Sequence, residues 1–374
     1  MYHLNGEPFS EQTPKQYFAV SGSNGSYQLN PATVVAIGGE AGFGIMTIDK
    51  NSASENTNGP YSIELKLDAE TIYSSTWEKF SFANSRGINS HVDYPALIGT
   101  GRRIQKSFVE PGNPLLIYKT MVNNGLVNLT DPQIHDAQYV ISDVAGNESV
   151  LNFKVRYVQS AAKLTKPIQG YMFRFGQTNE LDTNNVKITI PKNSLYSDLN
   201  FVYSSSPTPT GGYSEVHHVH NRLIPVHASY TLSIAANSNL PTKLQSKALI
   251  VNTNKIAQGG VYESGSVTAQ LRAFGSFYVA LDTIPPRITP VNIGNGRSLA
   301  GVSRVQFKIS DNLSGIKSFS GRIDGKWILM EYDAKTASLW HTFDNQTEIG
   351  RHDFQLILTD MKDNSTEFNA SFFR

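Results

Sequence analysis

Cysteine is absent from the 374 residues of this chain, and its absence removes several classes of site at once. Without thiols the chain forms no disulfides, no thiolate nucleophile, and no zinc or iron-sulfur centre that depends on cysteine. Thiol redox chemistry is therefore excluded. Proteins of reducing and of oxidising compartments can both lack cysteine, so the absence does not assign a compartment.

An excess of either charge is also missing. Lys and Arg number 32 and Asp and Glu number 31, which leaves a formal net charge of +1. A general nucleic-acid binder needs a basic surface that releases counterions from phosphates, so this class is not expected. Charged residues make up only 17% of the chain, while 29 glycines, 17 tyrosines and 19 phenylalanines are present. This composition favours β-sheets joined by many turns.

Long hydrophobic runs are absent as well. No stretch approaches the roughly 18 apolar residues of a membrane-spanning helix, so no membrane span is predicted. The first residues, Met1 to Glu7, have neither the basic segment nor the apolar segment of an export signal. The chain is expected either to be cytosolic or to begin downstream of an export signal.

Helical periodicity is rare, and short runs with alternating apolar and polar residues are common. Period two over five to seven residues is typical of half-buried strands. Such runs cover residues 61–67, 151–155, 186–190, 230–234, 267–271, 305–309 and 354–358. Only residues 94–99 and 242–248 are predicted to be helical, and both segments are short. The pattern predicts an all-β chain of antiparallel sandwiches.

Two breaks in composition divide the chain. Residues 159–167 are polar and end in proline, as in a linker. Residues 282–286 contain Pro285 and Pro286, which cannot donate to a ladder and hold the chain extended. We therefore expect three consecutive β-sandwich domains, at 1–157, 158–281 and 282–374. The first and last are predicted to be Ig-like.

A short internal repeat supports a shared fold at the two ends. Residues 143–149 and 360–366 both read Asp-x-x-x-Asn-x-Ser/Thr, and each precedes a predicted last strand. We expect a hairpin turn in which the aspartate accepts backbone N–H bonds and the asparagine is left-handed.

Histidine is scarce, but four of the nine histidines are His217, His218, His220 and His227. On a strand, His218 and His220 would share one face, and a His-x-His pair can give two imidazoles to one zinc. A catalytic zinc also needs a third ligand and a general base, for which Asp198 and Glu215 are the neighbouring carboxylates. The alternatives are a structural or adventitious metal site, or imidazoles bonded to backbone and to Tyr213.

Two further binding chemistries are open. The turns at Asp143 and Asp360, with Asp311 and Asn312, offer the oxygen ligands that calcium prefers, although turn capping explains these residues without an ion. Four aromatic residues could stack on sugars if exposed, although a sandwich core commonly buries tryptophan. These are Trp77, Trp327, Trp340 and Tyr332.

Several stretches resemble one known family. They are residues 17–27, 41–45, 61–65, 143–147, 217–221, 282–286, 310–316 and 325–332. Together they are similar to the C-terminal accessory region of lysostaphin/LytM-type zinc metallopeptidases from Gram-negative bacteria. Such peptidases bind zinc through His-x-x-x-Asp and a later His-x-His in a catalytic domain. No His-x-x-x-Asp occurs here, so the resemblance carries no catalytic residue over.

The resemblance implies a non-catalytic accessory or targeting region of a cell-envelope peptidoglycan metalloendopeptidase. It would position or shield the catalytic domain, with peptidoglycan or that domain as partner. Its implied place is the periplasm or the outer envelope, with an export signal expected upstream. No cofactor is expected apart from zinc at the histidines. The alternatives are a stand-alone zinc hydrolase that uses His218 and His220, and a carbohydrate-binding or adhesion protein. The sequence does not determine oligomeric state.

Overall fold

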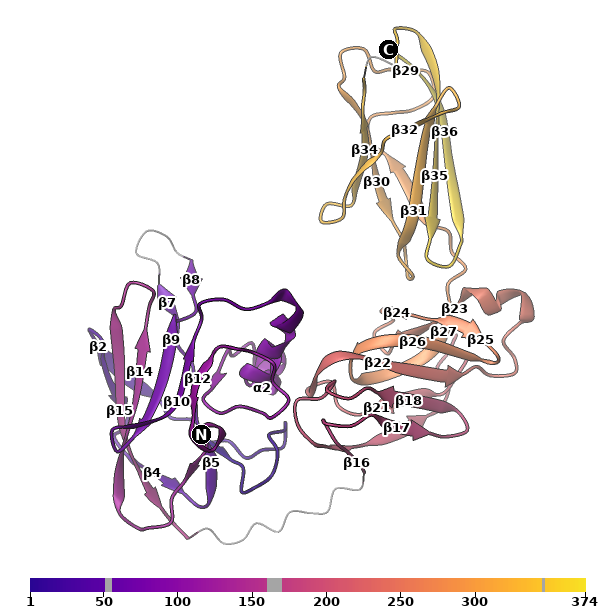
Figure 1. Ribbon diagram of the computed structural model, residues 1–374. Helices are drawn as coiled ribbons and strands as arrows, with labels where there is room; N and C mark the ends of the chain where they lie inside the picture. Colours follow the sequence, from indigo (N-terminus) through magenta and orange to yellow (C-terminus); the bar gives the residue numbers. More distant parts are fainter. Residues whose placement is uncertain (51–55, 160–169, 345–346) are drawn as a thin grey trace.

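The computed structural model describes residues 1–50, 56–159, 170–344 and 347–374 and confirms the all-β prediction (Figure 1). Strands at 2–157, 171–281 and 287–373 pair only within their own group, which gives three sets of sheets. Most of the predicted linker at 159–167 lies outside the described residues. The predicted strand segments all lie within observed strands or begin one residue before them.

The first domain contains one large sheet and several small ones. The large sheet runs β12 (Tyr118–Met121), β10 (Glu70–Thr76), β9 (Ser62–Leu67), β14 (Ile134–Ser142), β15 (Glu148–Tyr157), β3 (Ser26–Leu29), β2 (Val20–Ser23), with β4 (Val34–Ile37) also on β15. The smaller sheets are β1 (Tyr2–His3) with β5 (Glu40–Gly42) and β13 (Val127–Asn128), β6 (Gly44–Ile45) with β11 (Gln105–Lys106), and β7 (Asp49–Lys50) with β8 (Thr57–Asn58).

Short helices lie on the side of the first domain that faces the central domain (Figure 1). They are η1 (Phe82–Gly87), α1 (Ile88–His91) and α2 (Tyr94–Thr100), with η2 (Val122–Gly125) after β12. The predicted helix at 94–99 is confirmed as α2. It begins after Asp93, whose carboxylate accepts a hydrogen bond from the backbone N–H of Ala96 at 3.0 Å.

The central domain is built from two five-stranded sheets. The first runs β17 (Asn179–Asp182), β18 (Val186–Ile190), β22 (Pro225–Ala235), β26 (Ser266–Ala273), β25 (Val261–Glu263). The second runs β20 (Tyr203–Ser206), β21 (Val216–Val219), β27 (Gly275–Leu281), β23 (Ala248–Asn252), β24 (Ala257–Gly259). A small ribbon joins β16 (Tyr171–Phe173) and β19 (Leu199–Phe201), and the predicted helix at 242–248 is the 3₁₀ turn η3 (Thr242–Lys247).

The C-terminal domain is a sandwich of a four-stranded and a five-stranded sheet. The four-stranded sheet runs β28 (Arg287–Pro290), β30 (Arg304–Ser310), β34 (Ser338–Thr342), β33 (Glu331–Asp333). The five-stranded sheet runs β29 (Arg297–Ser298), β36 (Ser365–Phe373), β35 (Arg351–Asp360), β31 (Ile316–Ile323), β32 (Lys326–Ile328).

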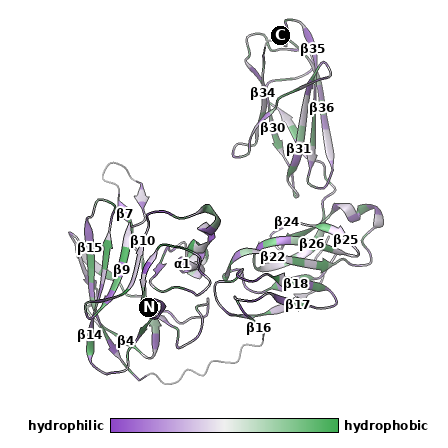
Figure 2. Cartoon of the chain, in the orientation of Figure 1, coloured by the Kyte–Doolittle hydropathy of each residue, from purple (hydrophilic) through white to green (hydrophobic). Residues whose placement is uncertain are grey.

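Each domain has its own hydrophobic core. The alternation seen in the sequence places every second side chain of a strand in that core, and Figure 2 shows hydrophobic and hydrophilic residues alternating along the strands. Ile63 and Leu65 of β9 are buried in the first core, Ile188 and Ile190 of β18 in the central core. The third core is formed in the same way, and burial of these side chains is the main favourable contribution to folding.

The repeated Asp-x-x-x-Asn motif forms the same turn at both ends of the chain. The Asp143 carboxylate accepts hydrogen bonds from the backbone N–H groups of Ala145 and Asn147 and from the Asn147 amide at 2.7 Å. The β35–β36 turn repeats these contacts. The hairpin prediction is confirmed, but the prediction of a left-handed asparagine is wrong. Gly146 (φ 86°) and Asp363 (φ 59°), the residues before the two asparagines, take that conformation, which glycine and aspartate tolerate better than most residues.

Candidate functional site

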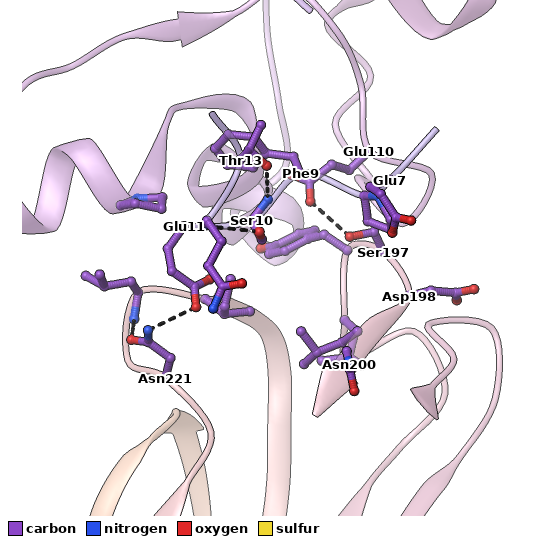
Figure 3. Close-up of a pocket in the computed structure, with 18 of the residues that line it drawn as sticks. Glu7, Phe9, Ser10, Glu11, Thr13, Glu110, Ser197, Asp198, Asn200 and Asn221 are labelled. Atoms are coloured by element: carbon purple, nitrogen blue, oxygen red, sulfur yellow. Dashed lines mark hydrogen bonds between the residues drawn. The ribbon is translucent and has the colours of Figure 1, made fainter. Parts of the chain in front are cut away.

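A cleft of about 1310 Å³ separates the first domain from the central domain (Figure 3). The N-terminal segment, residues 3–14, forms one wall. The opposite wall comes from residues 195–204 and from residues 218–225, which run from the end of β21 to the start of β22. Because the walls belong to different domains, the shape of the cleft depends on how these domains dock.

The cleft is predominantly acidic. Glu7, Glu11, Glu110 and Asp198 line it, and Figure 3 shows their side chains spread along both walls. The Asp198 carboxylate pairs with Arg174 at 2.5 Å. Carboxylates and amides accept hydrogen bonds, so the cleft suits a ligand that presents hydroxyl, amide or ammonium donors.

Glu110 links the two walls. Its Oε2 accepts hydrogen bonds from Lys106 Nζ and Ser90 Oγ, both at 2.6 Å, and its Oε1 accepts one from Ser197 Oγ at 3.2 Å. Ser197 belongs to the central domain. A second hydrogen bond across the cleft runs from the Asn221 amide to Glu11 Oε1 at 3.0 Å. These contacts fix two of the acidic side chains.

The docking of the two domains uses main-chain groups. The Gly112 N–H donates to the Tyr196 carbonyl at 2.7 Å, and the Tyr196 hydroxyl donates to the Arg86 carbonyl. The Arg86 guanidinium donates to the carbonyls of Val226 at 3.2 Å and Arg272 at 2.9 Å. A Cβ on Gly112 would lie 2.6 Å from the Leu195 carbonyl oxygen, so the backbones meet with no room for a side chain.

The four predicted metal-binding histidines lie in or next to the cleft wall, but they point in different directions. His217 of β21 is fully buried. Its Nδ1 shares a hydrogen bond of 2.8 Å with the Tyr203 hydroxyl, and its imidazole stacks on the Tyr203 ring. Both ring nitrogens of His218 meet serine hydroxyls, Ser276 at 2.8 Å and Ser206 at 3.0 Å. Burial lowers the pKa of His217.

The expectation that His218 and His220 share one strand face is wrong. Strand β21 ends at Val219, and the backbone of His220 is left-handed (φ 53°). The imidazole ring of His220 therefore stacks on Phe201, with ring centroids 5.5 Å apart. Burial lowers the pKa of His220 to about 4. His227 lies on β22, where its Nδ1 meets the Tyr196 hydroxyl at 3.3 Å. Its pKa is lowered first by burial and then by Arg86.

These positions bear on the zinc hypothesis. Within the described ranges, no set of three or more His, Asp or Glu ligand atoms within 4.8 Å of one another includes a histidine. Neither Asp198 nor Glu215 joins the imidazoles in such a set. Zinc at His217, His218, His220 or His227 stays a prediction that metal analysis can decide.

The aromatic residues differ in exposure. Trp327 is 65% exposed, beside exposed Leu329, while Trp77 and Trp340 are partly buried. Tyr332 is 38% exposed and packs on Phe319 with ring centroids 5.8 Å apart. The two exposed aromatic side chains lie on different sheets of the C-terminal domain, Trp327 on β32 and Tyr332 on β33.

Sequence patterns did not indicate the residues that build the cleft. Glu110, Arg86 and Gly112 lie in loops or in a 3₁₀ turn, and their partners are more than 80 residues away in the central domain. A lone charged residue or glycine in a loop carries no local signal for such a partner. Only the three-dimensional structure reveals them.

Comparison with known proteins places one part of the chain. Residues 170–282 match the model of the Zu5-like domain, and no curated protein matches the chain. Among the part of the chain that is described, no helix has the length and apolarity to cross a bilayer.

Three solved structures share low similarity with this chain. The fibronectin(III)-like modules of Clostridium thermocellum CbhA are 14% identical, with a TM-score of 0.20, over 39% of this chain and 85% of theirs. The Bacteroides ovatus mixed-linkage glucan protein SGBP-B, solved with a heptasaccharide, is 9% identical, with a TM-score of 0.16, over 91% and 65%. A bacterial ice-binding adhesin is 11% identical, with a TM-score of 0.17, over 85% and 87%. At these scores the similarities carry no functional argument; the chain is a multidomain β-sandwich protein in which residues 170–282 are similar to the Zu5-like domain.

Proposed function

We propose that this chain is the non-catalytic accessory and targeting region of a cell-envelope peptidoglycan metalloendopeptidase. In this role it acts outside the cytoplasm and positions the catalytic domain on peptidoglycan. The sequence resemblance supports the family, and the absence of a His-x-x-x-Asp motif supports a chain without its own catalytic zinc. The structure adds support for the positioning role.

The single observation that carries the proposal is the docking of the first and central domains across the acidic cleft. Arg86 and Gly112 bond main-chain groups, and Glu110 bonds a side chain of the opposite domain. Main-chain acceptors are fixed by the sheets and loops that carry them. The two domains therefore hold one orientation, as a module that positions a catalytic domain requires.

The cleft is the proposed binding surface for peptidoglycan. Its carboxylates and amides accept hydrogen bonds from sugar hydroxyls, peptide amides and ammonium groups, all of which peptidoglycan presents. Asn221 and Glu11, both partly exposed, meet from opposite walls of the cleft and are the pair proposed to contact the ligand.

Sedimentation with isolated sacculi tests this proposal. The purified chain is incubated with sacculi and zinc, and protein in the pellet and peptide fragments in the supernatant are measured. We expect pelleting without fragments. Released fragments would overturn the non-catalytic assignment, and the absence of pelleting would overturn targeting.

A pair of variants assigns the binding to the cleft. Glu11→Gln removes a carboxylate from the wall and is expected to reduce the pelleted fraction. Glu263→Gln, at an exposed position on β25 away from the cleft, is the matched control and is expected to pellet like the parent chain. Equal pelleting of both variants would place the binding surface elsewhere.

A second candidate function, carbohydrate binding by the C-terminal domain, is favoured by the exposure of Trp327. An exposed indole can stack on a sugar ring, which is a common basis of glycan recognition. Trp327→Ala would then abolish glycan retention on affinity gels, while Phe82→Ala, at a 96% exposed position of the first domain, would not. Retention of both variants would exclude the Trp327 surface.

A further inference from the structure

Three aspartates from distant parts of the chain meet where the central and C-terminal domains join. Asp282 directly follows β27, Asp311 follows β30, and Asp360 ends β35. One carboxylate oxygen from each lies within 4.8 Å of the other two. We refer to these residues as the aspartate triad. Figure 1 shows the C-terminal domain meeting the central domain near β23 at this junction.

The aspartate triad brings three carboxylates together at a largely buried position. Asp282 is 1% exposed and Asp360 is fully buried, while Asp311 is partly exposed. Among the described residues, no Lys, Arg or His nitrogen forms an ion pair within 4.0 Å of any of the three carboxylates. Removing several like charges from water without a directly paired counter-charge is costly, so the arrangement favours a bound cation.

The nearest lysines are held by other groups. Lys362 Nζ donates to the Gly260 carbonyl at 2.7 Å, and Lys247 Nζ donates to the Lys362 carbonyl at 2.6 Å. Both contacts join the two domains around the triad. The Lys362 pKa is lowered by burial, and Asp282 and Asp360 oppose that shift. These amines lie near the triad but do not bond to it.

The hydrogen bonds of the triad leave one buried oxygen without a partner. Asp311 Oδ2 accepts the N–H groups of Leu313 at 3.0 Å and Gly315 at 2.8 Å, which orients the carboxylate. Asp311 Oδ1 is buried and has no partner in the described structure, and the same holds for Ser314 Oγ on this loop. An unsatisfied buried carboxylate oxygen costs several times a typical hydrogen bond, and a cation would satisfy it.

The turn at Asp143 shows that the motif alone does not create this arrangement. Its side-chain contacts match those of Asp360, yet Asp143 is only partly buried and belongs to no such cluster within the described residues. The difference is that the Asp360 turn faces Asp282, the residue that directly follows the last strand, β27, of the central domain. The amide of Asn364 even donates to the Asp282 carbonyl at 3.0 Å.

We propose that the aspartate triad binds one Ca²⁺ ion and that this ion joins the central and C-terminal domains. Calcium prefers carboxylate and carbonyl oxygens at about 2.3–2.6 Å, so two oxygens on opposite sides of one ion lie about 4.6–5.2 Å apart. The spacing of the triad is compatible with contact to one ion. Asp282 supplies a ligand from the end of the central domain, and Asp311 and Asp360 supply ligands from the C-terminal domain.

The test measures Ca²⁺ binding to the full chain after chelation, by calorimetric titration and by thermal unfolding with and without Ca²⁺. We expect one equivalent of Ca²⁺ per chain and a higher unfolding temperature with the ion. Asp311→Asn should weaken Ca²⁺ binding about tenfold or more, because it removes a charged ligand. The new amide oxygen can still accept the Leu313 and Gly315 N–H groups, so this variant is expected to fold.

Asp363→Asn is the matched control. Asp363 lies in the same turn as Asp360, but its carboxylate is 69% exposed and pairs with Lys317 outside the triad. This variant should bind Ca²⁺ like the parent chain. The proposal is overturned if the parent chain shows neither binding heat nor a temperature shift, if Asp311→Asn responds fully, or if Mg²⁺ at the same concentration acts equally. None of these results depends on the acidic cleft.

Discussion

Replacement of Glu110 by glutamine should destabilise the first domain more than any exposed charge change does. Glu110 is the partner of Lys106, whose side chain is fully buried, with its Nζ 4.0 Å from the ring centre of Phe9. Burial lowers the Lys106 pKa, and Glu110 is the first group that opposes this shift. In Glu110→Gln the ammonium stays buried without its counter-charge.

The size of the effect follows from this geometry. Removal of one partner from a buried ion pair typically costs about 3–5 kcal/mol. Glutamine still accepts hydrogen bonds from Lys106 and Ser90, so we expect the lower end, about 3 kcal/mol. With a urea m-value of about 3 kcal/mol/M, the unfolding midpoint should fall by about 1 M.

Tryptophan fluorescence can follow this change in the first domain alone. Of the three tryptophans, only Trp77 belongs to that domain, where it lies edge-to-face against His91 at 5.2 Å. Urea unfolding is therefore measured in a background with Trp327→Phe and Trp340→Phe. The reporter then follows the domain that contains Glu110.

Asp136→Asn is the control in the same domain. Its ion pair with Lys154 is as short, 2.7 Å, but the two side chains are 78% and 56% exposed. Exposed pairs contribute little, so its midpoint should move by less than about a third as much. Equal shifts in the two variants would refute the argument from burial. A double replacement, Lys106→Met with Glu110→Leu, should recover much of the lost stability.

Three further predictions concern the docking contact, the buried imidazoles and zinc. Gly112→Ala should make the first and central domains unfold in separate calorimetric transitions, because overpacking against the opposite backbone costs about 1–3 kcal/mol. The control Gly176→Ala, which has open space around the new Cβ, should leave a single unfolding transition. Burial lowers the pKa values of His91 and His220 to about 4, below the ordinary 6.5, so only the unfolded chain takes up protons between these values. Stability is then complete above pH 6.5 and falls as the pH drops towards 4. His220→Asn, which tolerates the left-handed backbone, should flatten this dependence in thermal melts, and an unchanged slope would contradict it. His218→Ala should leave the zinc content of the purified chain unchanged, since both ring nitrogens already meet serines; loss of a stoichiometric zinc would support the hydrolase hypothesis.

Local features of the fold could be predicted from the sequence. Alternation at 186–190 predicted β18, because a strand that covers a core repeats every two residues. The Asp-x-x-x-Asn motif predicted its two hairpins because it is also a local feature. All the hydrogen bonds of the motif lie within five residues. The alternation of side chains along β21, however, does not extend to His220. This residue is left-handed and ends the strand, so its side chain does not share the strand face of His218.

The sites depend on contacts between segments far apart in the chain. The sequence drew attention to Asp311 and Asp360 as calcium ligands but not to Asp282, which appeared only as part of a proline-rich joint. The pairing of Glu110 with Ser197 spans 87 residues, and no periodicity records it. Such contacts arise from the docking of completed domains, so local sequence patterns do not predict them.

The docking of the first and central domains has a consequence for sequence drift. On the central domain, the acceptors for Arg86 and Gly112 are the carbonyls of Val226, Arg272 and Tyr196. A carbonyl is present whatever the side chain, so mutations at Arg272, whose side chain is exposed, leave its acceptor in place, whereas Val226 is also held by the central core. On the first domain, by contrast, the donor to two of these carbonyls is the Arg86 side chain, and the close approach of the two backbones requires glycine at position 112. Mutational tolerance is thus unequal across this contact, and homologues should vary more freely at the exposed Arg272 than at Arg86 and Gly112.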